Sequence, residues 1–278
     1  MTVAFVLGGG GVRGAVEIGM LRALLERGIR PDLVVGTSIG AINGALVARD
    51  PTPGVIEPLS RAWMSPEADA VYGESLVRQF GRLMKTRTHL SSPEPLRELL
   101  TTALGPTTRF EDLVVPLRVV AANVERAAER VFESGPLIEA ILASSAVPGL
   151  LPAVEIDGEH YIDGGIVNSI PIEQALTAGA TTVYVLQVGR VETPLVAPRS
   201  LVDAARVAFE IARRHRFARD LATRPPGVDL HVLPSGGELD GDDSLMSYRR
   251  MATVQKRIDR AFEATWAYLD DPAPAGSV

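Results

Sequence analysis

Cysteine is absent from the 278-residue chain, and lysine occurs only as Lys85 and Lys256. The lack of cysteine excludes disulfide bonds, zinc–thiolate sites and cysteine nucleophiles. An excess of positive charge is absent too, because the formal net charge at pH 7 is −6. This charge balance disfavours a nucleic-acid partner and keeps a protein soluble.

Long apolar runs are also missing. No stretch reaches the roughly 20 consecutive apolar residues that a membrane-spanning helix needs. The apolar run from Val3 to Leu7 has no basic leader and is too short for a signal peptide. We therefore expect a cytoplasmic location, with peripheral contact to a membrane as an option. Hydrophobic residues make up 46% of the chain and charged residues 22%, which is typical of a globular protein.

Strand and helix patterns alternate at the start of the chain. Thr2 to Leu7 predicts a buried strand, and apolar residues at helical spacing follow from Ala15 until Gly28. Asp32 to Val35 predicts a second strand, and a helix pattern begins after Gly40. A short helix between two such strands implies a parallel, right-handed unit that is buried on both faces.

The rest of the chain continues this α/β pattern without an internal repeat or a linker. A hairpin is predicted around Asp157-Gly158, because Asp-Gly favours a tight turn. A strongly β-forming segment follows at residues 182–188, and long helices are predicted over residues 201–222 and 245–269. The sequence thus predicts one domain over residues 1–278, with a frayed, flexible tail at 270–278.

A proline-rich stretch, residues 51–95, interrupts the pattern. We interpret it as a cap or insertion over the carboxyl edge of the sheet. Within it, residues 75–85 combine apolar side chains with Arg78, Arg82 and Lys85. Two interpretations remain open for the region 63–90: a solvated helix packed on the domain, or a basic, apolar-edged surface that meets lipid interfaces.

A single serine stands between the second strand and the following helix, in Gly36-Thr37-Ser38-Ile39-Gly40. Strand, sharp turn and helix in this order are typical of the nucleophile elbow of serine hydrolases. The glycines allow a tight turn and the close approach of a substrate. The helix that follows directs its N–H groups toward the same spot. Ser38 is therefore the candidate nucleophile.

A glycine-rich loop follows the first strand, with Gly9, Gly11 and Gly14 at the spacing of a dinucleotide-binding loop. A nucleotide site of this kind needs an acidic residue at the end of the second strand, but residues 36–38 occupy that place. The loops after two neighbouring parallel strands open on the same edge of a sheet. Backbone N–H groups of residues 9–11 can therefore face the carbonyl that Ser38 attacks, where each donor is worth about 3 kcal/mol or more.

A serine nucleophile needs a base. None of the four histidines has the loop context of a histidine in a catalytic triad; they are His89, His160, His215 and His231. Asp163, followed by Gly164 and Gly165, is the better candidate, because a carboxylate at a strand end can reach Ser38. Aspartate is a weak base in water, with a pKa of about 3.9, and burial would raise that pKa.

The three blocks Gly9 to Gly14, Gly36 to Gly40 and Asp163 to Gly165 together resemble the signature motifs of the patatin-like phospholipase family. Their order and their strand context match as well. Two lesser stretches are also similar to that family, namely Ala143 to Pro148 and Asn168 to Pro171. The resemblance covers about residues 2–190.

The resemblance implies a three-layer α/β/α sandwich with a mainly parallel central sheet, and a catalytic dyad of Ser38 and Asp163 without histidine. The implied oxyanion hole comprises Gly9, Gly10, Gly11, Arg13 and Ile39. Glycines that support the motifs are Gly14, Gly36, Gly40, Gly164 and Gly165.

The activity implied by the resemblance is hydrolysis of fatty-acyl esters of phospholipids, lysophospholipids or related lipids through an acyl-Ser38 intermediate, with neither metal nor cofactor. Three alternatives stay open: a nucleotide-binding protein that uses the loop Gly9 to Gly14, an acyltransferase of the same fold, and a degenerate member kept as a binding module. The oligomeric state is not predicted by the sequence.

Overall fold

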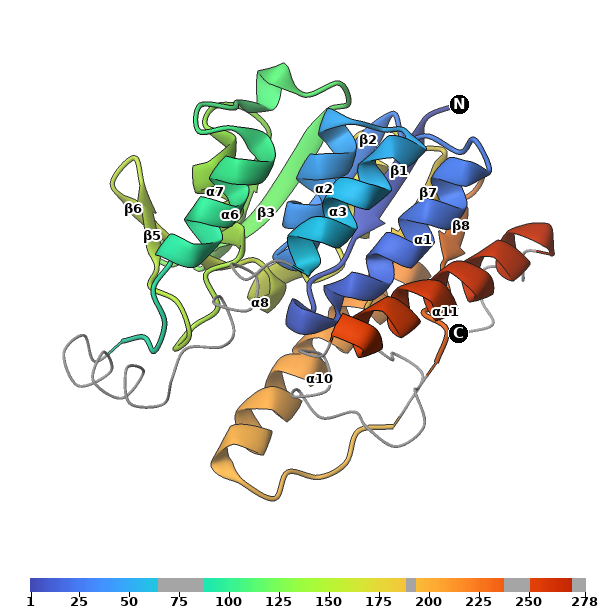
Figure 1. Ribbon diagram of the computed structural model, residues 1–278. Coiled ribbons are helices and arrows are strands. Elements are labelled where there is room, and N and C mark those ends of the chain that lie inside the picture. The colour runs from blue at the N-terminus through green and yellow to red at the C-terminus, as the bar shows by residue number, and fades with distance from the viewer. Residues whose placement is uncertain (65–87, 189–193, 238–250, 272–278) are drawn as a thin grey trace.

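The computed structural model describes residues 1–64, 88–188, 194–237 and 251–271 of the chain (Figure 1). In these ranges the chain forms an eight-stranded sheet with helices on both faces. The segment 75–85 and most of the region 63–90 lie outside the described residues, as does most of the tail expected at 270–278.

Five strands form the parallel part of the sheet. β1 (Val3–Leu7) lies between β2 (Leu33–Thr37) and β7 (Thr182–Leu186), while β3 (Leu117–Asn123) pairs with β2 and β8 (Asp229–Val232) pairs with β7. Their near-continuous apolar runs are typical of strands that are covered on both faces.

β2 extends two residues beyond the strand expected at 32–35. Gly36 and Thr37 still pair with Val119 and Val120 of β3. The apolar pattern ends at Val35, and glycine is depleted in strands, so the sequence predicted the end of this strand two residues too early. The extension matters because it carries the regular sheet up to the residue before the candidate nucleophile.

Three further strands run antiparallel to their neighbours. β4 (Ala128–Phe132) pairs with β3, and β5 (Val154–Ile156) and β6 (Glu159–Asp163) form the hairpin expected around Asp157-Gly158. Asp157 and Gly158 both have positive φ angles, 53° and 79°. This is the geometry that an Asp-Gly turn favours.

β2 and β6 share one edge of β3. β4 pairs with residues 119–123 of β3, and it therefore overlaps both the part that pairs with β2 (117–120) and the part that pairs with β6 (121–123). A strand has only two hydrogen-bonding edges, so β4 occupies one and the other two strands share the second. β2 and β6 consequently meet end to end, running in opposite directions.

The helices, in chain order, are α1 (Ala15–Glu26), α2 (Ile39–Arg49), α3 (Ile56–Trp63), α6 (Glu94–Leu104), α7 (Leu137–Ser144), α8 (Gly165–Asn168), α9 (Ile172–Thr177), α10 (Leu201–Ala222) and α11 (Met251–Asp270). Short 3-10 turns lie at Gly11–Gly14, Pro53–Val55 and Phe110–Asp112.

Alternate residues of β1 contact two separate hydrophobic cores. Phe5 and Leu7 lie in one core with α1, α2, α6, α7 and α11, whereas Ala4 and Val6 lie in the other with Ile172 of α9 and Phe217 of α10. Because successive side chains of a strand point to opposite faces, the sheet is the middle of three layers (Figure 1). The predicted three-layer α/β/α sandwich with a mainly parallel sheet is confirmed.

α10 is the arginine-rich amphipathic helix that the sequence predicts over residues 201–222. Arg213, Phe217 and Asp220 lie on its buried face at helical spacing. Arg213 pairs with Glu210, and Asp220 pairs with Arg216. Pairing matters because a buried charge without a partner costs several kcal/mol.

Candidate active site

Ser38 lies at a strained turn between β2 and α2. Its φ and ψ angles are 56° and −121°, a combination that a residue with a side chain rarely adopts. Such strain costs on the order of 1–3 kcal/mol and persists only where the surrounding structure imposes it. The turn is also tight: a Cβ on Gly36 would lie 2.4 Å from the Gly40 carbonyl oxygen. These are the features of a nucleophile elbow.

The structure brings the two predicted catalytic residues together. Oγ of Ser38 donates a 2.5 Å hydrogen bond to Oδ2 of Asp163, and the Gly165 N–H donates to Oδ1 at 2.7 Å. The side chains of Ser38 and Asp163 are both buried. Burial raises the pKa of Asp163 to about 6 from its ordinary 3.8, against the opposing hydrogen bonds from Ser38 and Gly165. The carboxylate is therefore a stronger base than an aspartate in water.

The glycine loop lies beside the nucleophile. A Cβ on Gly9 would lie 3.5 Å from Cβ of Ser38, so a larger residue would crowd the serine. The Gly9 N–H donates to the Ser169 carbonyl at 2.8 Å. Because this amide is already engaged, the loop donors that remain for an oxyanion are Gly10 and Gly11, whose N–H groups have no acceptor among the described residues.

Two further groups expected in the oxyanion hole lie next to this loop. Ile39 is the first residue of α2, and the first N–H groups of a helix lack partners within that helix. The main-chain N–H of Arg13 donates to the Gly10 carbonyl at 3.3 Å and closes the turn after the loop.

A buried carboxyl group that the sequence reasoning missed belongs to Glu17 of α1. Its Oε2 accepts a 2.7 Å hydrogen bond from Nδ2 of Asn43, which also lies 3.2 Å from the Gly14 carbonyl. Asn43 in turn accepts from Nε1 of Trp63 at 3.0 Å. Burial raises the pKa of Glu17 well above its ordinary value, although hydrogen bonds from Asn43 and the Gly8 backbone oppose the shift. The network joins the glycine loop, the elbow helix and the end of α3.

His89, His160 and His231 contact side chains other than Ser38 and Asp163. Nδ1 of His160 lies 2.6 Å from Glu125, and His231 contacts Tyr268 and Asp229. Among the described residues, no histidine is hydrogen-bonded to the side chain of Ser38 or Asp163, whose side-chain partners are those given above. That the base is a carboxylate stays a prediction.

Three partly exposed apolar side chains lie near the loop of Asp163. Val147, Ile166 and Phe209 are 39%, 41% and 41% exposed. The main-chain N–H of Asp163 donates to Ala146, the neighbour of Val147. The ring edge of Phe209 lies 3.0 Å, and Oδ1 of Asp163 2.9 Å, from the place of a Cβ on Gly165. The dyad is thus bordered by apolar surface.

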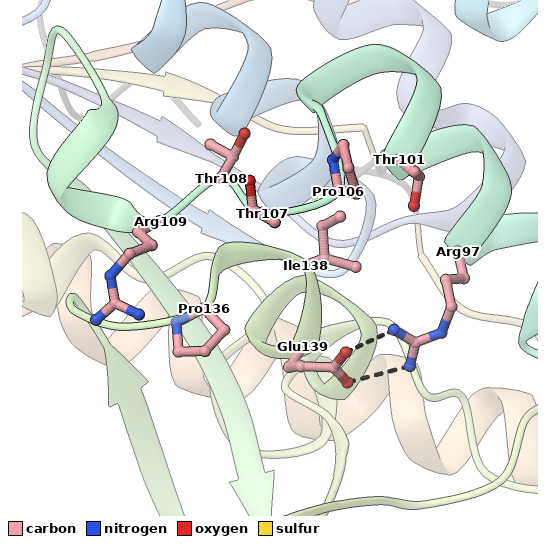
Figure 2. A pocket seen from close by; sticks show the side chains of 9 residues that line it. All are labelled: Arg97, Thr101, Pro106, Thr107, Thr108, Arg109, Pro136, Ile138 and Glu139. Carbon is pink, nitrogen blue, oxygen red and sulfur yellow. Dashed lines mark hydrogen bonds and ion pairs between the residues drawn. The ribbon is translucent and has the colours of Figure 1, made fainter.

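A separate cavity of about 210 Å³ lies between α6 and the start of α7 (Figure 2). Arg97 and Glu139 face each other across it and form a two-pronged ion pair with distances of 2.5 and 3.1 Å. None of the lining residues belongs to the dyad or to the glycine loop. The cavity is therefore distinct from the site around Ser38 and Asp163.

In the described parts of the chain, no three His, Asp or Glu side chains gather in a group that could hold a metal ion. None of the helices in the same parts combines the length and apolar character needed to cross a membrane.

Comparisons with known proteins identify a family. The family model for patatin-like phospholipase matches residues 5–176. Patatin-like phospholipase domain-containing protein 7 of Rattus norvegicus is 33% identical over 196 residues, which are 69% of this chain and 14% of that protein. Lysophospholipase NTE1 of Mycosarcoma maydis is 32% identical over 262 residues, which are 94% of this chain and 13% of that protein. The chain thus spans a small part of the length of these relatives.

A solved structure shares the fold. The crystal structure of VipD from Legionella pneumophila superposes with a TM-score of 0.51 at 15% identity, covering 97% of this chain and 66% of VipD. At this identity the likeness concerns the fold alone. The family model, by contrast, spans the elbow, the glycine loop and the aspartate, and it shows that the chain belongs to the patatin-like phospholipase family.

Proposed function

We propose that this protein hydrolyses fatty-acyl esters of phospholipids, lysophospholipids or related lipids, with Ser38 as nucleophile and Asp163 as general base. The observation that carries the proposal is the 2.5 Å hydrogen bond between Ser38 Oγ and Asp163 Oδ2 at a strained elbow. Membership of the patatin-like phospholipase family supports the substrate class.

The first half of the proposed reaction forms an acyl-enzyme. The Ser38 hydroxyl passes its proton to the Asp163 carboxylate while Oγ bonds to the ester carbonyl carbon. The resulting tetrahedral intermediate carries a negative oxygen. When it collapses, the bond to the leaving alcohol breaks, and Asp163 returns the proton to the alcohol oxygen. The second half repeats these steps with water in place of the alcohol and releases the fatty acid.

The negative oxygen requires hydrogen-bond donors that are already in place. The N–H groups of Gly10 and Gly11 are the loop amides without another acceptor among the described residues. With the Ile39 amide at the start of α2, they form the proposed oxyanion hole, and Arg13 adds positive charge beside it. Fixed donors of this kind contribute about 3 kcal/mol or more each to transition-state stabilisation.

Apolar surface next to the dyad supports a lipid acyl group as the part of the substrate that binds there. Val147, Ile166 and Phe209 present carbon atoms to solvent around the catalytic aspartate. Burying apolar side chains under an acyl chain is favourable by about 25 cal/mol per Å². The proposed contact of the region 63–90 with a membrane concerns residues that mostly lie outside the described ranges.

The test compares Ser38→Ala and Asp163→Asn with the unaltered protein on p-nitrophenyl acyl esters and on a panel of phospholipids and lysophospholipids, with mass-spectrometric detection of products. We expect both variants to lose turnover while circular dichroism shows an intact fold. Full activity of Ser38→Ala would refute the proposal. Acyl transfer to an added alcohol in place of free fatty acid would identify an acyltransferase instead.

Each histidine is also replaced singly, as a control for the identity of the base. These variants should keep most of the activity. If the loss of one histidine matched the loss of Ser38, the base would not be Asp163. Tight binding of a nucleotide in calorimetry, without ester hydrolysis, would favour the alternative use of the glycine loop.

A further inference from the structure

The strained elbow is supported by a side chain outside the dyad. The main-chain N–H of Ser38 donates to Oγ of Ser144 at 2.8 Å, and the Ser144 hydroxyl donates to the Val120 carbonyl at 2.5 Å. Because an N–H only donates and a carbonyl only accepts, the direction of both hydrogen bonds is fixed. Ser144 ends α7 and is fully buried, at 0% exposure.

The Ser144 hydroxyl replaces one direct hydrogen bond between β2 and β3. The Val34 N–H donates to the Pro116 carbonyl, and β2 and β3 remain in register as far as Thr37 opposite Val120. Parallel ladders repeat every two residues, so the same series leads from Val34 and Pro116 to the Ser38 N–H and the Val120 carbonyl. Ser144 bridges these two groups instead. The chain can therefore leave the sheet at Ser38 while both polar groups stay satisfied.

The same segment also holds the aspartate. The Asp163 N–H donates to the Ala146 carbonyl at 2.9 Å, and the Gly164 N–H donates to the Ser144 carbonyl at 3.2 Å. Ser144 thus contacts the nucleophile with its side chain and the loop of the base with its main chain. A single short segment at the end of α7 therefore fixes the two halves of the dyad relative to each other.

We infer that Ser144 is a positioning residue for the dyad: its hydroxyl holds the Ser38 amide and keeps Oγ of Ser38 in line with Asp163. This inference rests on the proposed function. We expect the loss of this support to lower the reaction rate, because a displacement of about 1 Å at a reacting atom can cost 10²-fold in rate. Substrate binding outside the dyad does not involve Ser144, which is inaccessible to solvent.

The neighbouring residue supplies a matched control. Ser145 is also buried, at 6% exposure, but its hydroxyl has no hydrogen-bond partner in the described part of the chain. Ser144→Ala and Ser145→Ala therefore remove the same atom from adjacent positions, and only the first removes a bridge. Ser144→Thr restores a hydroxyl at the bridging position.

The experiment measures kcat and KM on a p-nitrophenyl ester, and the rate at which a fluorophosphonate labels Ser38, at a temperature where all variants are folded. We expect Ser144→Ala to lower kcat and the labelling rate by roughly 10- to 100-fold, with KM nearly unchanged. Ser145→Ala should behave like the unaltered protein, and Ser144→Thr should recover part of kcat.

A kcat of Ser144→Ala within about threefold of that of Ser145→Ala would overturn the inference. If Ser144→Ala does not fold, Ser144→Cys takes its place, because a thiol is a weaker donor and acceptor; a kcat equal to that of Ser145→Ala would then be the contrary result. The Ser38→Ala variant distinguishes a failure of the proposed function from a failure of the role of Ser144. If it stays active, the proposed function fails; if it is inactive while Ser144→Ala is fully active, only the role of Ser144 fails.

Discussion

Thr37 and Asp163 lie end to end along one edge of β3, opposite the consecutive residues Val120 and Ala121. β2 reaches this point from one direction and β6 from the other. The hydrogen-bonded ladder of β3 therefore sets the spacing of two chain segments that are 125 residues apart. The contact between Ser38 and Asp163 depends on sheet pairing rather than on a long loop, which suits a site that must be held rigidly.

The pH dependence of activity should report the state of Asp163. Burial raises the pKa of this carboxyl to about 6, and only the ionised form can accept the proton of Ser38. We therefore expect kcat/KM to fall as the pH decreases through about 6, and to level off above it. A pH–rate profile between pH 4 and 8, with intact folding checked at each pH, measures this. A profile governed by a group near pH 4 would contradict the raised pKa.

Asp163→Asn should stabilise the fold at neutral pH while it removes activity. A carboxyl group whose pKa is raised by folding contributes to the stability of the folded protein while it is protonated. This contribution is lost as the pH rises from about 4 to about 6. The shift of about two pKa units corresponds to about 3 kcal/mol. Asparagine remains neutral and avoids this loss. The free energy of unfolding from urea titrations at pH 4 and pH 8 provides the measurement.

The comparison of the two pH values separates this effect from other consequences of the substitution. The difference in stability between Asp163→Asn and the unaltered protein should be larger at pH 8 than at pH 4. Equal differences in stability at pH 4 and pH 8 would show that ionisation of Asp163 does not destabilise the folded protein.

Phe209→Ser should weaken the use of long acyl chains. The Phe209 ring lies next to Gly165, close to the proposed base Asp163. Phe209 belongs to α10, which lies outside the residues matched by the family model. Loss of this apolar contact should raise KM several-fold for long-chain esters, by the equivalent of about 1–2 kcal/mol, and leave short-chain esters nearly unaffected. The assay compares p-nitrophenyl esters of increasing chain length.

Ile211→Ser is the control for Phe209→Ser. Ile211 is 55% exposed on the same helix, but residues two apart on a helix do not face the same side. Its replacement should leave the chain-length profile unchanged. If both variants shifted the profile equally, a general effect on α10 would explain it, and the acyl contact would not.

Gly40→Ala should destabilise the protein although alanine is the better helix former. In a helix interior the exchange of glycine for alanine gains about 1 kcal/mol. A Cβ at this position, however, would lie 2.2 Å from the Leu7 carbonyl oxygen, where α2 passes close to β1. Overpacking costs about 1–3 kcal/mol or more, so we expect a net loss. Gly44→Ala, whose Cβ would meet side chains only, the nearest being Val34 at 3.0 Å, should lose less in the same denaturant titration.

The motif residues could be predicted from the sequence because their chemistry depends on local order along the chain. A serine between strand and helix, a glycine loop after a strand, and Asp-Gly-Gly after a hairpin each carry their own backbone requirement, and the structure shows each in that setting. The helical spacing of apolar residues in α10 likewise indicated its buried face, where Phe217 lies.

Contacts between distant segments were decided only by the tertiary structure. The sequence did not reveal that β6 approaches antiparallel along the edge of β3, that the Gly9 amide is bound by Ser169, or that Glu17 lies buried beside Asn43. From the sequence, Ser144 was only one residue of the stretch Ala143 to Pro148, without a role of its own. Such contacts depend on strand register and on packing across more than 100 residues, which no local pattern encodes, whereas the backbone geometry of each motif is encoded where the motif stands.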